Sequence, residues 1–294
     1  MNSLFKASDG QPLDSPDAIR KNIVRKILKT AEEEFRKDII DPKRSKASKR
    51  SPHEENSRQY IDGYIRAKET ILVNGRTIRH ALRWSWEPEY IGDGDFKWCG
   101  AAVAAVYASA GFHPRLCFKN TASTDRWDAY GRYSYSFFKR NKVTVTPKVA
   151  ATYPILTGQE GTWEIKELHE ACGLPRLYIR LSSDSLFSEL PWDPAPGDVI
   201  LVGSDGEGKR TWGSHVTMMV DLPRDRQHHL PHRGYYGTYE GNANVWGPRG
   251  NRREGVGYYM RPLGGYEHPS HQLSLRRVIR PSILDFIPEL EYSK

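Results

Sequence analysis

The run WCGAAVAAVYASAGF, from residue 98 to residue 112, constrains the fold of this 294-residue chain more than any other segment. Alanine, glycine and serine take more than half of its positions, and such small residues let neighbouring elements approach the backbone closely. The run therefore predicts a tightly packed, buried helix. Gly111 is expected to end it, because glycine readily takes the backbone conformation that closes a helix.

An amphipathic helix is predicted near the N-terminus. Ser15 followed by Pro16 is typical of a helix start, since serine caps the first turn and proline fits within it. Apolar residues then recur at helical spacing as far as Phe35, which gives one apolar stripe. Pro42 is expected to end the helix.

Changes in composition divide the chain into three parts. We interpret residues 1–42 as a helical appendage that serves docking or delivery and is dispensable for chemistry. Residues 43–58, KRSKASKRSPHEENSR, are a basic, serine-rich linker. Residues 59–294 form the main domain.

Within the main domain, helices are expected first and strands afterwards, which is typical of an α+β fold. The predicted helices cover about residues 59–72, 98–112, 121–139 and 163–173. Asn74-Gly75 is a turn signal. The predicted strands are the β-rich runs GDVILVG, SHVTMMVD, YYGTYEGN and GVGYYMRP, all after Pro196.

Four residues in these elements suggest nucleophilic catalysis. Cys99 stands at a predicted helix start, where free N–H groups and the helix dipole lower the pKa of a thiol. His215 opens a predicted strand and is a candidate general base. Glu240 and Asn242 lie at the end of the next strand, and either can accept the second imidazole N–H and orient the ring.

Four segments in chain order resemble the CHAP and NlpC/P60 group of papain-like amidases and endopeptidases. They are FKWCGAAVAAVYASAGF, PAPGDVILVG, GSHVTMMV and YEGN. The shared pattern is an aromatic-cysteine pair that opens a helix, P-G-D before a first strand, G-x-H-V on a second and E-x-N at the end of a third. NTASTDRWDAYG, residues 120–131, is similar to a segment after the cysteine helix in some of these enzymes. The resemblance covers roughly residues 84–260.

The resemblance implies a papain-like α+β fold in which the cysteine helix packs on an antiparallel sheet. It also implies hydrolysis of amide bonds in bacterial cell-wall peptidoglycan. By matching positions, Cys99 is the nucleophile, His215 the base and Glu240 the orienting acid, with Asn242 as the alternative third member.

Two departures from the family pattern shape this expectation. The papain-like catalytic domain, residues 59–294, carries an insertion at about residues 141–191, where we expect a lid or a specificity element. No repeated wall-binding module is visible, which favours an antibacterial effector delivered by a secretion machine, or a compact phage lysin.

Tryptophans near the predicted catalytic residues are candidates for substrate binding, because their rings can stack on a glycan. Trp98 precedes the cysteine, while Trp212 and Trp246 flank the base and the third residue. The others that we considered are expected to pack in the core: Trp84, Trp86 and Trp127. Cys117 and Cys172 have no base partner in any recognisable pattern and are interpreted as structural.

Two other functions stay open on the sequence. An acyltransferase or deamidase acting on another substrate would use the same three residues with a different acceptor. A non-catalytic basic binding module would instead use the run from Lys43 to Arg50 to contact nucleic acid. The presence of Cys99, His215 and Glu240 together argues against an inert module.

No cofactor and no metal is expected. Asp93 and Asp95 supply too few oxygen ligands for calcium and are interpreted as caps of the cysteine helix. The HHLPH cluster, residues 228–232, reads as a solvated loop. Part of the net charge of +8 belongs to the linker, so net charge alone selects no partner, and nucleic acid is not the expected one.

The expected partner is peptidoglycan, with delivery machinery reached through residues 1–42 and an inhibitor or immunity protein as further expectations. The N-terminus lacks the apolar stretch of a signal peptide, and no apolar run is long enough to span a membrane. We expect synthesis in the cytoplasm and action in the bacterial periplasm or cell wall after delivery.

Overall fold

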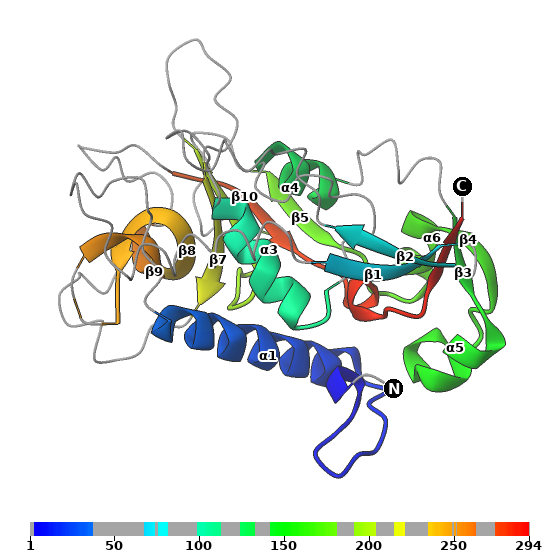
Figure 1. Ribbon diagram of the computed structural model, residues 1–294. Helices are drawn as coiled ribbons and strands as arrows, with labels where there is room; N and C mark the ends of the chain where they lie inside the picture. The colour runs from blue at the N-terminus through cyan, green and yellow to red at the C-terminus, as the bar shows by residue number, and fades with distance from the viewer. Residues whose placement is uncertain are drawn as a thin grey trace.

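The computed structural model describes most of the elements that the sequence predicts, together with a second sheet (Figure 1). The described residues are 3–37, 68–73, 76–81, 99–112, 124–132, 142–180, 191–203, 215–220, 235–248, 250, 252–262 and 274–293. Within these ranges no helix is long and apolar enough to cross a membrane.

The α-helices are short apart from the first. They are α1 (Pro16–Arg36), α3 (Cys99–Ser109), α4 (Thr124–Gly131), α5 (Pro147–Thr152) and α6 (Ile165–Ala171). Among the described residues they are accompanied by the 3-10 helices η1 (Ser3–Phe5), η3 (Pro154–Leu156) and η6 (Ile283–Phe286).

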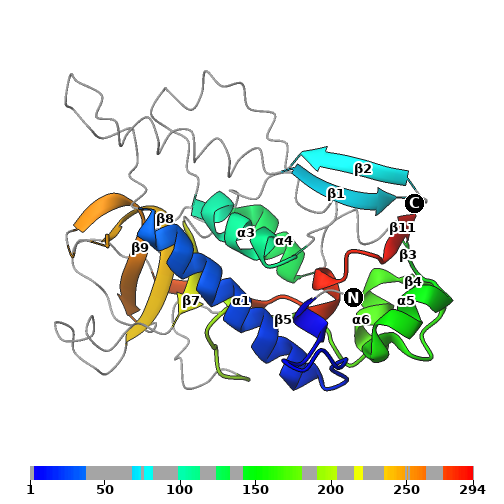
Figure 2. The same cartoon turned by 60° about the horizontal axis from the view of Figure 1, so that its bottom comes forward.

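The described strands form two sheets, which together with the helices give an α+β fold. The six-stranded sheet is fully antiparallel and has the order β5 (Leu177–Arg180), β10 (Ser274–Arg280), β6 (Val199–Gly203), β7 (His215–Val220), β8 (Tyr235–Trp246) and β9 (Arg252–Pro262). The five-stranded sheet has the order β2 (Arg76–Ala81), β1 (Lys68–Val73), β11 (Glu291–Ser293), β3 (Lys142–Val145) and β4 (Gly161–Glu164). Its β1–β11 pair is parallel and the others are antiparallel. Figures 1 and 2 show it at the end of the molecule opposite β8 and β9.

The elements that carry the candidate catalytic residues form as predicted. The alanine-rich helix α3 begins at Cys99, and Gly111 beyond its end has a φ of 96°. The four predicted strands appear as β6, β7, β8 and β9, which lie side by side in sequence order. Helix α3 packs against β7 and β8, so its first residue is held near the start of β7.

Other elements differ from the prediction. Residues 68–73 form strand β1 rather than the last part of a helix, because the strand pairs with β2 from Lys68↔Ala81 to Val73↔Arg76. The predicted turn at Asn74-Gly75, the residues 59–67 and the linker 43–58 lie outside the described residues. The helix expected from Trp163 begins two residues later, because Trp163 pairs with Val143 in the sheet.

The predicted insertion at 141–191 is built into the fold rather than standing apart from it. Its strands β3 and β4 complete the five-stranded sheet, and β5 forms the edge of the six-stranded sheet. Tyr153 is fully buried, packs edge-on against Phe5 at 4.8 Å between ring centroids, and donates a hydrogen bond to Glu289 at 2.6 Å. The part of the insertion around Tyr153 therefore stabilises the core.

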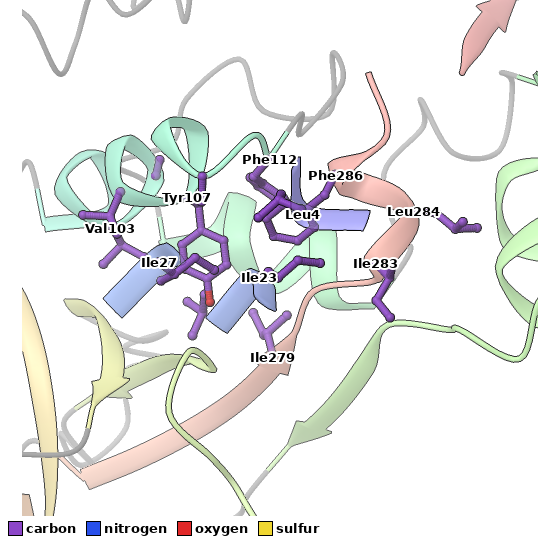
Figure 3. Close-up of a cluster of buried hydrophobic side chains, with 14 of the residues drawn as sticks. Leu4, Ile23, Ile27, Val103, Tyr107, Phe112, Ile279, Ile283, Leu284 and Phe286 are labelled. Atoms are coloured by element: carbon purple, nitrogen blue, oxygen red, sulfur yellow. The ribbon is translucent and has the colours of Figure 1, made fainter. Parts of the chain in front are cut away.

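Helix α1 begins as predicted, with Pro16 in its first turn and the Ser15 hydroxyl accepting a hydrogen bond from the Ala18 N–H. It ends at Arg36, before Pro42. The apolar stripe lies in the main core, where Ile23 and Ile27 face Val103 and Tyr107 of α3 (Figure 3). Its buried residues are Ile19, Ile23, Ile27, Thr30, Ala31, Glu34 and Phe35.

Polar and steric contacts also tie α1 to the six-stranded sheet. The Arg20 guanidinium donates to the Pro281 carbonyl at 2.7 Å, just beyond β10. At the other end of the helix, the Tyr258 hydroxyl of β9 donates to Glu32 at 2.9 Å. Between them, a Cβ on Gly197 would lie 3.1 Å from Val24, and the φ of +87° at Gly197 itself favours glycine. The P-G-D segment is thus shaped to receive α1.

This packing differs from the separate appendage that the sequence predicted. An apolar stripe must be covered, and the sequence does not reveal which surface covers it. Here the stripe is covered by α3 and by the residues around η6, so α1 shares one core with the elements that hold Cys99 and His215.

We expect Ile23→Ala to lower the free energy of unfolding of the whole protein by about 2–5 kcal/mol, the range for removing a large buried aliphatic side chain. Ile23 is fully buried in the shared core. Urea unfolding followed by circular dichroism measures the change. Lys21→Ala, at an exposed position of the same helix, is the control and should change stability little. A helix that packed independently would leave the main unfolding transition unchanged.

Candidate active site

Cys99 is the first residue of α3, and its side chain is almost completely buried, with 2% of its surface exposed. Small side chains in this helix allow it to lie close against β7 and β8. The backbone N–H groups of Gly100 and Val216 hydrogen-bond to the sulfur. The local fold therefore gives the thiol two fixed donors of the kind that stabilise negative charge.

His215 is the first residue of β7, and its imidazole connects Cys99 to Glu240. Its Nε2 lies 2.8 Å from Glu240 Oε2. The thiol of Cys99 also hydrogen-bonds to the ring. Since Nε2 faces the carboxylate, Nδ1 is the nitrogen left for the sulfur. The three side chains form a continuous hydrogen-bonded chain.

Strand register explains why these side chains meet. Strands β7 and β8 are antiparallel, and Thr217 lies directly opposite Glu240. His215 is two residues before Thr217 and projects from the same face of the sheet, so it is a diagonal neighbour of Glu240. This diagonal separation is short enough for an imidazole and a carboxylate to make a hydrogen bond.

The electrostatics of the pair favour a thiolate beside an imidazolium. Burial raises the pKa of the Cys99 thiol, but the neighbouring His215 and the hydrogen bonds to the sulfur outweigh it and hold the pKa below its ordinary value. Burial also lowers the pKa of His215. The charge and hydrogen bonds of Cys99 and Glu240 overcome this and raise it to about 9. Each group therefore stabilises the charged form of the other.

Glu240 is fully buried, and every one of its described polar contacts favours the ionised form. Arg261 of β9 donates from Nε to Oε1 at 2.8 Å and from Nη2 to Oε2 at 2.5 Å. The Thr238 hydroxyl donates to Oε1. Burial raises the pKa of this carboxyl, and Arg261 and His215 together bring it well below its usual range.

Asn242, the alternative third residue, lies on β8 two positions beyond Glu240, at a register shift between β8 and β9. Its side chain is outside the described part of the structure. The contact that orients His215 in the structure comes from Glu240.

The aromatic candidates are only partly described. Trp127 is fully buried and stacks on Phe112 at 6.3 Å between ring centroids, so its predicted place in the core is confirmed. Trp246 is the last residue of β8, and its side chain is not described. The candidates Trp98 and Trp212 lie outside the described ranges, as do Trp84 and Trp86.

The remaining cysteines and the metal candidates give little further chemistry. Cys172 is partly exposed, and burial raises its pKa to about 11, so it is a poor nucleophile. Cys117, Asp93, Asp95 and the cluster at 228–232 lie outside the described residues. Within the described ranges no group of three or more His, Cys, Asp or Glu side chains could hold a metal ion.

Sequence reasoning missed Arg261 and Thr238. Thr238 is two residues before Glu240 on the same strand and therefore shares its face, a signal that alternation along a strand provides. Arg261 had no such signal. It is the next-to-last residue of the run GVGYYMRP, and only the pairing of β8 with β9, which sets Tyr236 opposite Arg261, brings it toward Glu240.

Comparisons of the chain with protein-family models, with curated proteins and with solved structures found no match. The chemistry of the site must therefore be argued from its own geometry. A buried thiol with a lowered pKa, a histidine that can carry a proton and a carboxylate that orients the histidine are the parts needed for covalent catalysis by a cysteine nucleophile.

Proposed function

We propose that this protein is a papain-like cysteine hydrolase that cleaves amide bonds in bacterial cell-wall peptidoglycan. The observation that supports it most is the hydrogen-bonded chain from Cys99 through His215 to Glu240. The order of these residues along the sequence, with the cysteine at a helix start and the others on successive antiparallel strands, also agrees with the CHAP and NlpC/P60 pattern.

The proposed reaction begins with attack of the Cys99 thiolate on the carbonyl carbon of the scissile amide. The His215 imidazolium gives its proton to the leaving amine as the C–N bond breaks, which leaves a thioester on the enzyme. Neutral His215 then takes a proton from a water molecule, which attacks the thioester. Release of the carboxylic acid product restores the thiolate and the imidazolium.

Glu240 and the helix start have separate roles in this scheme. Glu240 accepts a hydrogen bond from the far side of the imidazole, so the other ring nitrogen stays directed at the sulfur. The N–H groups of Gly100 and Val216 hold the thiolate in the resting state. Once the sulfur has bonded to the carbonyl carbon, N–H groups at a helix start can stabilise the oxyanion of the tetrahedral intermediates that precede and follow the thioester.

Peptidoglycan as the substrate rests on the sequence resemblance and needs a direct test. Purified sacculi should be incubated with the protein, and the released fragments separated and identified by mass spectrometry. We expect fragments with a new carboxyl and a new amino terminus at one type of amide bond. Cys99→Ala protein should release none.

The products also separate this proposal from its rivals. Covalent labelling of an added amine acceptor without net hydrolysis would indicate an acyltransferase. Conversion of a side-chain amide to a carboxylate would indicate a deamidase. Intact sacculi with an unmodified Cys99 would reject cell-wall hydrolysis.

The proposal extends to delivery from the producing cell and to protection of that cell by an inhibitor protein. A delivery machine that bound α1 would have to use its outer face, because the inner face is part of the core. That face is rich in exposed charged residues, among them Lys21, Arg25, Lys29, Glu33 and Arg36.

A further inference from the structure

Arg261 lies at the end of the series of hydrogen-bonded side chains from Cys99 to Glu240, and it contacts both carboxylate oxygens of Glu240. The guanidinium meets both oxygens of Glu240 through two different nitrogens, at 2.8 and 2.5 Å. Its Cζ atom also lies over the Tyr259 ring, 4.8 Å from the ring centroid. Only 12% of the Arg261 side chain is exposed, and none of the Glu240 side chain. This two-pronged contact fixes the carboxylate in both position and rotation.

The charges of the hydrogen-bonded side chains alternate in sign. Cys99 as thiolate, His215 as imidazolium, Glu240 as carboxylate and Arg261 as guanidinium sum to zero. Without the guanidinium, three buried groups would carry a net negative charge. Burial makes such an excess costly, so the most basic of the anions would take up a proton. That anion is the thiolate, because a thiol is a weaker acid than a carboxyl group.

We propose that Arg261 is a positioning residue that holds the Glu240 carboxylate and balances its charge, so that Cys99 rests as a thiolate beside the His215 imidazolium. The importance of this role for turnover rests on the proposed cysteine hydrolase function. The charge balance itself is a property of the site with no substrate bound.

The other groups around these four hydrogen-bonded side chains add no further charge. Among the described residues, the charged groups that lower the pKa of Glu240 are Arg261 and His215, and the charged group that lowers the pKa of Cys99 is His215. Tyr236 of β8 interacts with both Glu240 and Arg261, and Tyr259 of β9 faces Arg261. The Tyr236 hydroxyl is buried without a hydrogen-bond partner among the described residues, and burial raises its pKa, so it remains neutral.

The rate of alkylation of Cys99 by iodoacetamide, measured across a range of pH, tests the proposal without any substrate. The thiolate is the reacting species, so the midpoint of the rate profile gives the pKa of the thiol. Mass spectrometry of peptides assigns the label to Cys99 and separates it from Cys172 and Cys117. The variants are Arg261→Met, Arg261→Lys, Glu240→Gln and the double variant Glu240→Gln/Arg261→Met, each checked for fold by circular dichroism.

We expect Arg261→Met to raise the midpoint by about one pH unit or more, the size of effect that a nearby opposite charge has on a buried group. Alkylation at about pH 6 should then slow by about tenfold. Arg261→Lys keeps the positive charge but cannot contact both Glu240 oxygens through two fixed nitrogens. Its midpoint should therefore lie between those of Arg261→Met and the wild type. Glu240→Gln leaves an excess positive charge, so its midpoint should fall.

The double variant separates charge balance from a merely structural role. It removes one charge of each sign and keeps an amide oxygen that can accept from His215, so its midpoint should return most of the way to the wild-type value. If Arg261→Met does not fold, the comparison of Glu240→Gln with the double variant measures the same effect. The midpoint of the double variant should then be higher than that of Glu240→Gln.

Three results would overturn the proposal: a wild-type midpoint at the ordinary thiol pKa, a folded Arg261→Met protein with the wild-type midpoint, or a double variant that shows no rise above Glu240→Gln. These results are independent of the substrate. If the wild type leaves sacculi intact while Arg261 controls the midpoint, the proposed function fails and the role of Arg261 stands. If sacculi are cleaved and the midpoint does not depend on Arg261, the proposed function stands and the proposed role of Arg261 fails.

Discussion

Cys99→Ser is expected to reduce the rate of hydrolysis by about 10⁴–10⁶-fold, the loss seen when a member of a catalytic triad is removed in a related mechanism. The site lowers the pKa of the Cys99 thiol below its ordinary value through His215 and two N–H donors. A serine hydroxyl is a far weaker acid, so the same surroundings leave it protonated. Release of fragments from purified sacculi, followed over time, measures the loss.

The exchange of sulfur for oxygen changes the volume of a buried side chain only slightly, so fold and substrate binding should be kept. Circular dichroism and co-sedimentation with sacculi check both. Cys172→Ser is the matched control, because Cys172 is partly exposed and has a raised pKa of about 11. Its activity should equal that of the wild type. A Cys99→Ser protein that kept wild-type turnover would show that the nucleophile lies elsewhere.

His215→Ala is expected to cause a loss of similar size, about 10⁴–10⁶-fold, for two reasons that act together. In the proposed mechanism, the variant lacks the group that protonates the leaving amine and later activates water. It also lacks the positive charge and hydrogen bond that lower the Cys99 pKa. Burial, which raises the pKa of the thiol, is then opposed only by the N–H groups of Gly100 and Val216, so the pKa rises from its value in the wild type.

The second reason gives a readout that needs no substrate. Alkylation of Cys99 near neutral pH should slow by at least about tenfold in His215→Ala, since the thiolate becomes a minor species. His169→Gln is the control. His169 is also buried, beside Asp285 and far along the chain from the site, so its replacement should affect stability rather than the reactivity of Cys99. Rapid alkylation of Cys99 in His215→Ala would mean that the helix start alone activates the thiol.

The sequence predicts the elements that carry their own local signal. A run of small residues specifies α3, and alternating β-rich runs specify β6 to β9. The short segment 68–73 has no decisive periodicity of its own, and its strand is set by pairing with β2 and β11, which lies more than 200 residues further along the chain. Non-local pairing of this kind is not visible in a local pattern.

The residues of the candidate site also divide into those with a local sequence signal and those placed by non-local pairing. Cys99, His215 and Glu240 stand at the ends of predictable elements, which made them candidates. Arg261 depends on the register between β8 and β9, and this pairing is interrupted by shifts after Glu240 and around Trp246. A shift of one residue would send the Arg261 side chain to the opposite face, so no count along the sequence could assign it to Glu240. Gly131 shows the same limit, since its role is the close approach of Tyr178.

The packing of α1 has a consequence for how the chain reaches its fold. The Arg20 hydrogen bond to Pro281 joins positions 261 residues apart, and the apolar stripe meets the residues around η6. During synthesis from the N-terminus, α1 leaves the ribosome well before η6, which lies more than 200 residues further along the chain. The stripe is therefore only partly covered until nearly all of these residues have been translated. Nascent chains stopped before residue 274 should remain open to proteases and to chaperones that bind apolar helices.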